Sequence, residues 1–302
     1  MDAEKLTLKF DDRVAAVPCV ELVAFSFAAP ADGAGFARFL RVFCEAFGDR
    51  LAVYRTGDMK RFRPFDVKSL EGPSHWFSDP ALLATKLLGF EAHAGATGRD
   101  IAAPAIDISL MGNFDPQRYV FRMVLPVESG DSPDLVIRLA QDALAEFPLD
   151  SGYCGYSLLW DRDPSVDRAI CEWAAPLLRR HPGLGYGKPV SIANASEMGL
   201  AVVNWLTLLG PELTAAMKGG DALAQNAPAE VGVLPLGQGG AMLRAGEAPG
   251  LGDVNRRDPL PLYQAVGRLV APVVAPDEAL DEVAVDGMEG DDAYDWLRRF
   301  FV

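Results

Sequence analysis

The sequence lacks the features that would place the protein in a membrane or an oxidising compartment. Its best apolar run, residues 200–210, is about half as long as the ~20 residues of a membrane-spanning helix. The first residues are acidic and lead into an alternating segment, so no secretory signal is recognisable. We therefore expect a cytoplasmic protein.

Cysteine and histidine are scarce, which bears on metal and redox chemistry. The cysteines form no CxxC pair and have no histidine close enough in sequence to complete a zinc site. They are expected to be reduced and buried as small apolar side chains. The sequence predicts neither a metal site nor a cofactor. The positions concerned are Cys19, Cys44, Cys154 and Cys171.

Positive charge is also in short supply. Lysine and arginine number 28 against 42 aspartates and glutamates, so the net charge is 28 − 42 = −14. A field of this sign repels nucleic-acid phosphates and anionic lipid surfaces. We expect no direct binding to nucleic acid or to a membrane. A basic protein partner would be attracted, although acidity is common among soluble proteins and names no partner by itself.

The motifs that usually accompany catalysis are absent. The chain contains no GxSxG, no HExxH, no GxxxxGK[ST] and no GxGxxG after a strand. The glycine-rich stretch 183–189 has Pro189 where a phosphate loop needs serine or threonine, and it is interpreted as a connector. Gly237–Gly240 lies between two expected strands and is interpreted as a hairpin turn.

One stretch has the spacing of a calcium-binding loop. Val166, however, stands where that loop requires glycine. The sequence therefore predicts a helix that begins at Pro164 with Asp163 as its N-cap. The residues at the ligand positions are Asp161, Asp163, Ser165, Asp167 and Glu172.

Three isolated residues remain as candidates for a catalytic or ligand-binding group. Glu21 lies in an apolar strand, His75 precedes two aromatic residues, and Asp253 lies in a glycine-rich turn. A simpler interpretation exists for each: an exposed strand edge, the neighbourhood of a helix start, and ordinary turn chemistry. We favour these interpretations and expect a protein that acts by binding and not by catalysis.

The hydrophobic pattern predicts alternating strands and helices in both halves of the chain. In the first half it indicates strands over 5–10, 20–28, 105–110, 118–127 and 153–160 and helices over 32–47 and 132–147. A short helix is expected at Pro80, with Ser78 as its N-cap. In the second half it indicates helices over 164–180, 211–217 and 262–270 and strands over 200–208, 231–236 and 240–245.

Each half therefore follows the order strand, helix, strand, strand, helix, as in ferredoxin-like βαββα units. With 302 residues, the chain is also too long for one average domain. We predict an α+β fold with two lobes, 1–160 and 161–302. Each lobe is expected to have a mixed or antiparallel sheet with helices packed on one face, and the second to end in an acidic helix.

The C-terminal stretch is strongly acidic. No lysine or arginine occurs between Arg268 and Arg298. In contrast, basic residues outnumber acids between Arg55 and Lys68, which could provide a counter-charge within the fold. The acids of the C-terminal stretch are Asp277, Glu278, Asp281, Glu282, Asp286, Glu289, Asp291, Asp292 and Asp295.

Four segments together resemble one known family. They are Gly152–Tyr156, Asn204–Gly210, the run Gly239–Gly246 followed by Pro249 and Gly252-Asp253, and Trp296–Phe300. In this order they are similar to the type VI immunity family, long catalogued only as a domain of unknown function. The resemblance covers most of the chain, although each segment alone is weakly specific.

The resemblance implies a cytoplasmic antidote, encoded beside a toxin that a type VI secretion system injects into neighbouring bacteria. Such an antidote neutralises its toxin by tight binding and needs no catalysis. A nuclease is the expected toxin, because it needs a positive surface to hold phosphates and an acidic protein can occupy that surface. The sequence does not determine the oligomeric state.

The acids from Asp277 to Asp295 are the predicted toxin contacts, with Tyr294 and Trp296 as an apolar anchor. A competing interpretation is that the acids complement the dipole of a last helix whose buried face carries Trp296 and Phe300. Two other classes of function stay open. One is a cryptic enzyme around Glu21, His75 or Asp253, and the other is a regulatory module with a small-ligand site between the lobes.

Overall fold

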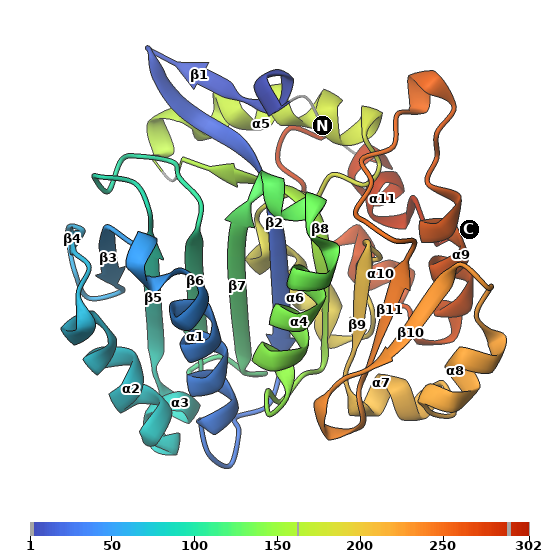
Figure 1. The fold of residues 1–302 in the computed structure, drawn as a ribbon, viewed down its shortest axis with the longest axis horizontal. Coiled ribbons are helices and arrows are strands. Elements are labelled where there is room, and N and C mark those ends of the chain that lie inside the picture. The colour runs from blue at the N-terminus through green and yellow to red at the C-terminus, as the bar shows by residue number, and fades with distance from the viewer. Residues whose placement is uncertain (1–2, 162, 289–290, 302) are drawn as a thin grey trace.

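One antiparallel sheet of eleven strands runs through the protein (Figure 1). The computed structural model describes residues 3–161, 163–288 and 291–301. The strands are ordered β10-β11-β9-β8-β2-β7-β6-β5-β3-β4, and β1 pairs with β2 outside this path. Their bounds are β1 Leu8–Phe10, β2 Arg13–Ser26, β3 Val53–Thr56, β4 Arg63–Pro64, β5 Leu87–His93, β6 Ala105–Met111, β7 Arg118–Pro126, β8 Ser151–Trp160, β9 Leu206–Leu209, β10 Val231–Pro235 and β11 Ala241–Ala245.

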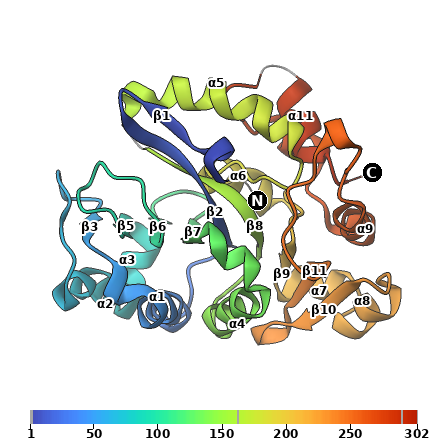
Figure 2. The same ribbon diagram turned by 45° about the horizontal axis from the view of Figure 1, so that its top comes forward.

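Helices lie on both sides of this sheet. In Figure 2, α1, α2 and α4 line one side, and α5 and α6 lie on the other. None of the helices in the described ranges is long and apolar enough to cross a membrane. The helices are α1 Ala34–Phe47, α2 Glu71–Ser78, α3 Pro80–Thr85, α4 Pro133–Leu144, α5 Pro164–Arg180, α6 Pro189–Glu197, α7 Pro211–Ala216, α8 Gly220–Asn226, α9 Pro261–Leu269, α10 Asp277–Asp281 and α11 Asp291–Arg298.

The predicted aromatic stripe of α1 forms the centre of the core on the first side. Phe36 and Phe39 lie 4.6 Å and 5.2 Å, between ring centroids, from Phe121 of β7. Phe147, which follows α4, lies 5.0 Å from the same ring. Each ring is almost fully buried. Such a cluster contributes dispersion and hydrophobic burial together, and it fixes α1 and α4 on the sheet.

The α+β class and the antiparallel sheet are confirmed. The sheet passes from the first half of the chain into the second without interruption, because β8 pairs with β9 from Ser151↔Leu209 to Cys154↔Leu206. The two halves of the chain are therefore joined by main-chain hydrogen bonds. Their division at residue 160 stays a prediction.

Several local predictions were wrong, and the elements β4, α6, α8 and α10 were not predicted. The strand predicted over 200–208 is confined to Leu206–Leu209. Just before it, the Asn204 side chain accepts a hydrogen bond from the Trp205 amide, and the hydroxyl of Thr207, within β9, donates to the Asn204 carbonyl. The helix α3 is capped by Asp79, whose carboxylate accepts hydrogen bonds from two backbone amides. Ser78 instead donates its hydroxyl to the carbonyl of His75, at the end of α2. The strands β3 and β5 and the helix α2 were not predicted.

Candidate functional site

The acids predicted to contact a toxin lie on α10, on the segment after it and on α11. Those within the described ranges are all exposed. Five of them, with Tyr294, line a groove of about 490 Å³ formed by residues of both helices. We call this the acidic groove, and its acids are Asp277, Glu278, Asp281, Asp291 and Asp295.

Most of the charge in the acidic groove is not neutralised by the protein itself. Arg298 forms an ion pair with Asp277. Among residues 3–161, 163–288 and 291–301, no lysine or arginine forms an ion pair with any of the other four acids. Asp291 lies in the first turn of α11, where a carboxylate complements the helix dipole. The remaining negative charge faces solvent and can attract a basic surface.

The other acids of the predicted set have different surroundings. Asp292 forms an ion pair with Arg179 of α5 at 2.6 Å. Glu282 is exposed at the end of α10. Glu289 lies outside the described residues. The nine acids therefore do not act as one cluster, since only some of them gather in the acidic groove.

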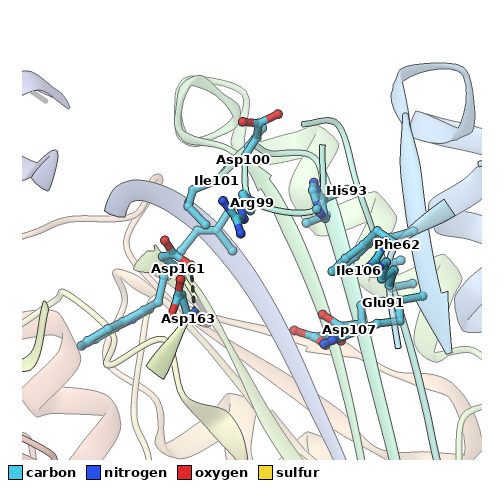
Figure 3. Close-up of a pocket in the computed structure, with 18 of the residues that line it drawn as sticks. Phe62, Glu91, His93, Arg99, Asp100, Ile101, Ile106, Asp107, Asp161 and Asp163 are labelled. Atoms are coloured by element: carbon cyan, nitrogen blue, oxygen red, sulfur yellow. Dashed lines mark hydrogen bonds and ion pairs between the residues drawn. The ribbon is translucent and has the colours of Figure 1, made fainter. Parts of the chain in front are cut away.

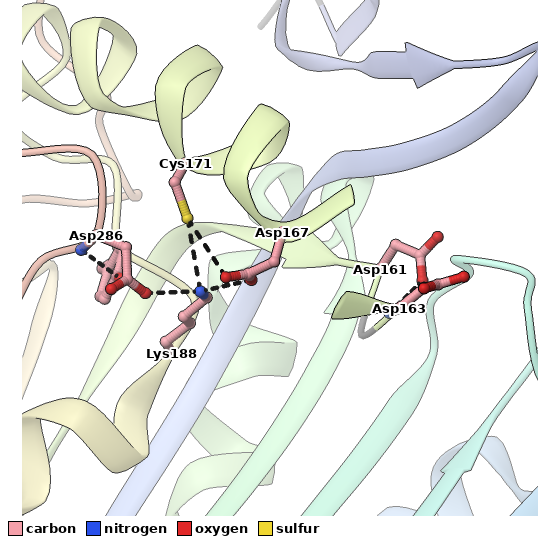
Figure 4. Close-up of polar contacts among 7 residues, drawn as sticks. Asp161, Asp163, Asp167, Cys171, Lys188 and Asp286 are labelled. Carbon is pink, nitrogen blue, oxygen red and sulfur yellow. Dashed lines mark hydrogen bonds and ion pairs between the residues drawn. The ribbon is translucent and has the colours of Figure 1, made fainter. Parts of the chain in front are cut away.

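Asp286 links two segments of the chain and does not line the acidic groove (Figure 4). Its carboxylate accepts hydrogen bonds from Lys188 at 2.8 Å and from the Tyr186 hydroxyl at 2.7 Å. Burial would raise the pKa of Asp286, but these two donors hold it below its ordinary value. Asp286 thus fixes the segment after α10 onto the connector between α5 and α6.

Asp286 is also one of three neighbouring residues whose side chains carry atoms that can ligate a metal ion. Asp167, Cys171 and Asp286 place one ligand atom each within 4.8 Å of the others. The Nζ atom of Lys188 lies among them, 2.8 Å from both carboxylates and 3.7 Å from the Cys171 sulfur (Figure 4). A lysine ammonium therefore already supplies the positive charge that a metal ion would bring.

Of the two residues of the predicted apolar anchor, only one is accessible to a partner. Trp296 is 4% exposed and Phe300 is 2% exposed, so the interpretation of these residues as the buried face of α11 is correct. The guanidinium of Arg299 lies 3.8 Å from the Trp296 ring centroid and covers it. Tyr294 is half-buried and lines the acidic groove, where it is the accessible aromatic residue.

Glu21 is not on an exposed edge, and that expectation was wrong. Strand β2 pairs with β7 on one side and with β8 on the other, which places Glu21 in the middle of the sheet. Its side chain is fully buried, and its carboxylate lies 2.7 Å from the Nε atom of Arg122. Arg122 also donates to the carbonyl of Leu158. Glu21 is therefore held in a buried ion pair.

The other two isolated candidates lie on different elements from Glu21. His75 is exposed on α2. Asp253 caps a short 3-10 turn and accepts three hydrogen bonds from Arg180, which lower the pKa of the Asp253 carboxyl. The contacts of Asp253 match ordinary turn chemistry, whereas His75 lies in the last turn of α2 and not beside a helix start. The calcium-like spacing belongs to a helix start, where the Asp163 carboxylate accepts from the Ser165 amide at 3.0 Å.

A cavity of about 570 Å³ was not predicted (Figure 3). It opens on the side of the sheet opposite α1, over β3, β5 and β6, and continues to the segment after β8. In the sequence, this cavity was indicated only by the excess of basic residues between Arg55 and Lys68. Within the described residues, that stretch does not neutralise the acids of the acidic groove. We call this the cation-rimmed cavity, and its walls include Arg55, Lys60, Arg61, Phe62, His93 and Arg99.

The fold is similar to that of a solved structure. The chain is similar to the Pseudomonas aeruginosa T6SS protein PA0821, with a TM-score of 0.81 and 18% sequence identity. The match covers 98% of this chain and 87% of that chain. At this identity the likeness shows the fold alone. No curated protein matches the sequence significantly.

Comparison with family models gives a direct assignment. The model described as type VI immunity for VRR-NUC matches residues 36–300. The match includes α1, every strand from β3 to β11 and the acidic groove. It agrees with the resemblance seen in the four sequence segments. The chain therefore belongs to the family of type VI immunity proteins for VRR-NUC.

Proposed function

We propose that the protein is a cytoplasmic antidote that binds a cognate type VI toxin with nuclease activity and holds it inactive without catalysis. Membership of the family supports the immunity role and the class of toxin. The single structural observation that supports this mode of action is the acidic groove. It presents exposed carboxylates on two adjacent helices, and most of them form no ion pair with a lysine or arginine of the described residues.

The acidic groove matches what a nuclease offers. A nuclease holds the phosphates of its substrate with positive side chains, because phosphate contacts dominate nucleic-acid affinity. A protein surface with carboxylates in place of phosphates can take the same cations and exclude the substrate. The net charge of −14 adds a long-range attraction that raises the association rate.

Co-expression tests the proposal at the level of the whole protein. The product of the adjacent gene is expressed alone and together with this protein, and growth and co-purification are scored. Rescue of growth with a stable complex is expected. Absence of both would contradict the antidote role.

Charge reversal tests the acidic groove. A variant with Glu278→Lys, Asp281→Lys, Asp291→Lys and Asp295→Lys keeps the buried Trp296 and should weaken the complex at least tenfold, or about 1.4 kcal/mol. Most of the loss should appear in the association rate at low salt. The control variant reverses four exposed acids outside the groove, Asp49, Glu128, Glu230 and Glu247, and changes the net charge equally. Equal losses in both variants would refute a specific role of the groove.

A further inference from the structure

The sheet has an open face on its second side. The helix α6 contacts β7 and β2 there, and it is joined to β7 by the ion pair between Glu197 and Arg118. Beyond α6, the residues of β5 and β6 that face this side are half-exposed, including Glu91, His93 and Asp107. This open face forms the floor of the cation-rimmed cavity.

The carboxylates around the cavity are already engaged. Arg13 lies 3.1 Å from Asp161 and 3.2 Å from Asp163. Arg55 forms an ion pair with its cross-strand neighbour Glu91. The carboxylate of Asp100 accepts a hydrogen bond from the backbone amide of Thr97 at 2.7 Å, and Asp107 has an interaction of its own. Glu91, Asp161 and Asp163 are therefore paired with a cation, whereas Asp100 is held by a backbone amide.

The positive side chains at the rim are in the opposite situation. Lys60, Arg61 and Arg99 are exposed, and within the part of the chain that the structure describes their side chains take part in no hydrogen bond or ion pair. They come from two loops, the β3–β4 loop and the β5–β6 loop, that meet over the cavity. These three rim cations therefore present positive charge to solvent, in a protein whose net charge is −14.

The walls of the cavity are fixed by packing. The Phe62 ring lies edge-on to His93, with ring centroids 5.0 Å apart, and the Arg55 guanidinium lies 4.9 Å from the Phe62 centroid. At Gly98 of the opposite loop, a Cβ atom would lie 2.3 Å from the Phe62 ring, so a larger residue there would displace the ring. Because the two loops are already in contact, a ligand would meet the cations without first ordering the loops.

We infer that the cation-rimmed cavity is a second contact surface, which takes an acidic segment of the toxin. The inference rests on the proposed function and adds a contact of opposite sign. The phosphate-binding surface of a nuclease is basic and would be repelled by Lys60, Arg61 and Arg99. The segment that enters must therefore be another part of the toxin, with a carboxylate for the rim and room in a cavity of about 570 Å³.

A nucleic acid is a poorer occupant than a protein segment. Every added phosphate of a nucleic acid would face the surrounding negative field of the chain. An acidic protein segment brings one or a few carboxylates to the three cations and can place neutral residues elsewhere. Charge complementarity therefore favours a peptide segment over a polyanion.

The test compares two charge-matched variants in binding to the toxin that co-purifies with the wild-type protein. The first is Lys60→Glu/Arg61→Glu/Arg99→Glu. The control, Arg138→Glu/Lys218→Glu/Arg268→Glu, reverses three exposed cations outside the cavity and acidic groove, so the net charge changes equally. The cavity variant should weaken the complex at least tenfold, and the control less than threefold. Circular dichroism and thermal melting verify that each variant is folded. The milder variant Lys60→Ala/Arg61→Ala/Arg99→Ala should also bind the toxin more weakly than the control variant does.

Each outcome supports or overturns the inference. If the wild-type protein binds the toxin and the cavity variants bind it as the control does, the inference fails while the proposed function stands. If the wild-type protein forms no complex, both fail. If millimolar ATP or citrate raises the melting temperature of the wild-type protein but not of the cavity variant, and toxin binding is unchanged in that variant, the cavity is a small-anion site and the inference is overturned.

Discussion

The ion pair between Glu21 and Arg122 makes a sharp prediction about stability. Its two side chains are 0% and 5% exposed, and their charged atoms lie 2.7 Å apart. Glu21→Gln keeps the shape of the side chain and an acceptor for Arg122 but removes the negative charge. Arg122 is then left as an uncompensated charge inside the protein, which costs about 3 to 5 kcal/mol when a partner is removed. We expect a loss of about 3 kcal/mol, because the Gln oxygen still accepts a hydrogen bond.

The matched variant removes the other charge. Arg122→Met should cost about as much, since it leaves the Glu21 carboxylate buried without its cation. The variant Glu21→Gln/Arg122→Met removes both charges and should be far less destabilised than the sum of the two single variants. It still loses the donor to the Leu158 carbonyl, which is worth about 1 kcal/mol. We therefore expect a coupling energy of about 2 to 4 kcal/mol.

Urea unfolding measures these free energies. Far-ultraviolet circular dichroism and tryptophan fluorescence should give coincident transitions, which supports a two-state treatment. Single variants within about 1 kcal/mol of the wild-type protein would refute the reasoning, because that is the value of an exposed pair. A double variant as unstable as the sum of the single ones would also refute it, because the two charges would then not interact.

Two further predictions concern Asp286 and Gly155. Asp286→Asn should cost less than about 1 kcal/mol at pH 7, because Asp286 and Lys188 are 46% and 24% exposed. The pKa of Asp286 is lowered in the folded protein, so its contribution is present above the unfolded pKa of about 4 and is lost as the pH falls through the lower folded value. Urea unfolding from pH 7 to acid should therefore show the two proteins converging below about pH 4, and a constant difference would contradict the assignment. Gly155→Ala should cost about 1 to 3 kcal/mol, since its Cβ would lie 2.0 Å from the Asn204 Oδ1 atom. Gly220→Ala, with nothing within 4 Å, is the control and should melt at or above the wild-type temperature.

Amphipathic helices and tight hairpins could be predicted from the sequence because their signals are local. The stripe of α1 and the glycine turn between β10 and β11 are of this kind. The strands β3 and β5 were missed because β3 is short and Gly89 interrupts the pattern of β5. The position of Glu21 could not be predicted, because it depends on which strands pair with β2, and those partners lie about 100 and more residues away.

The candidate site was predictable in composition but not in geometry. The excess of acids in the C-terminal stretch is visible in the sequence, yet no local pattern separates Asp281 in the groove from Asp286 on Lys188. That difference arises from a contact between residues 98 positions apart. The cation-rimmed cavity has the same origin, since its walls join residues 55–107 to residues 159–163.

The continuous sheet gives these two surfaces a common frame. In Figure 1, α10 and α11, whose residues form the acidic groove, lie on the side of β9 and β11, and β3 and β5 under the cation-rimmed cavity are at the opposite end of the sheet. The hydrogen-bonded pair β8 and β9 belongs to the sheet that joins them. An acidic groove alone would attract any basic protein, including many that are not the toxin. A cavity with unpaired cations repels a partner that is basic throughout and accepts one that also carries an acidic segment. Discrimination by attraction at one site and repulsion at another is how specific interfaces reject close alternatives. A toxin that satisfies both surfaces must present opposite charges at a spacing set by the sheet, which is a stricter requirement than either charge alone.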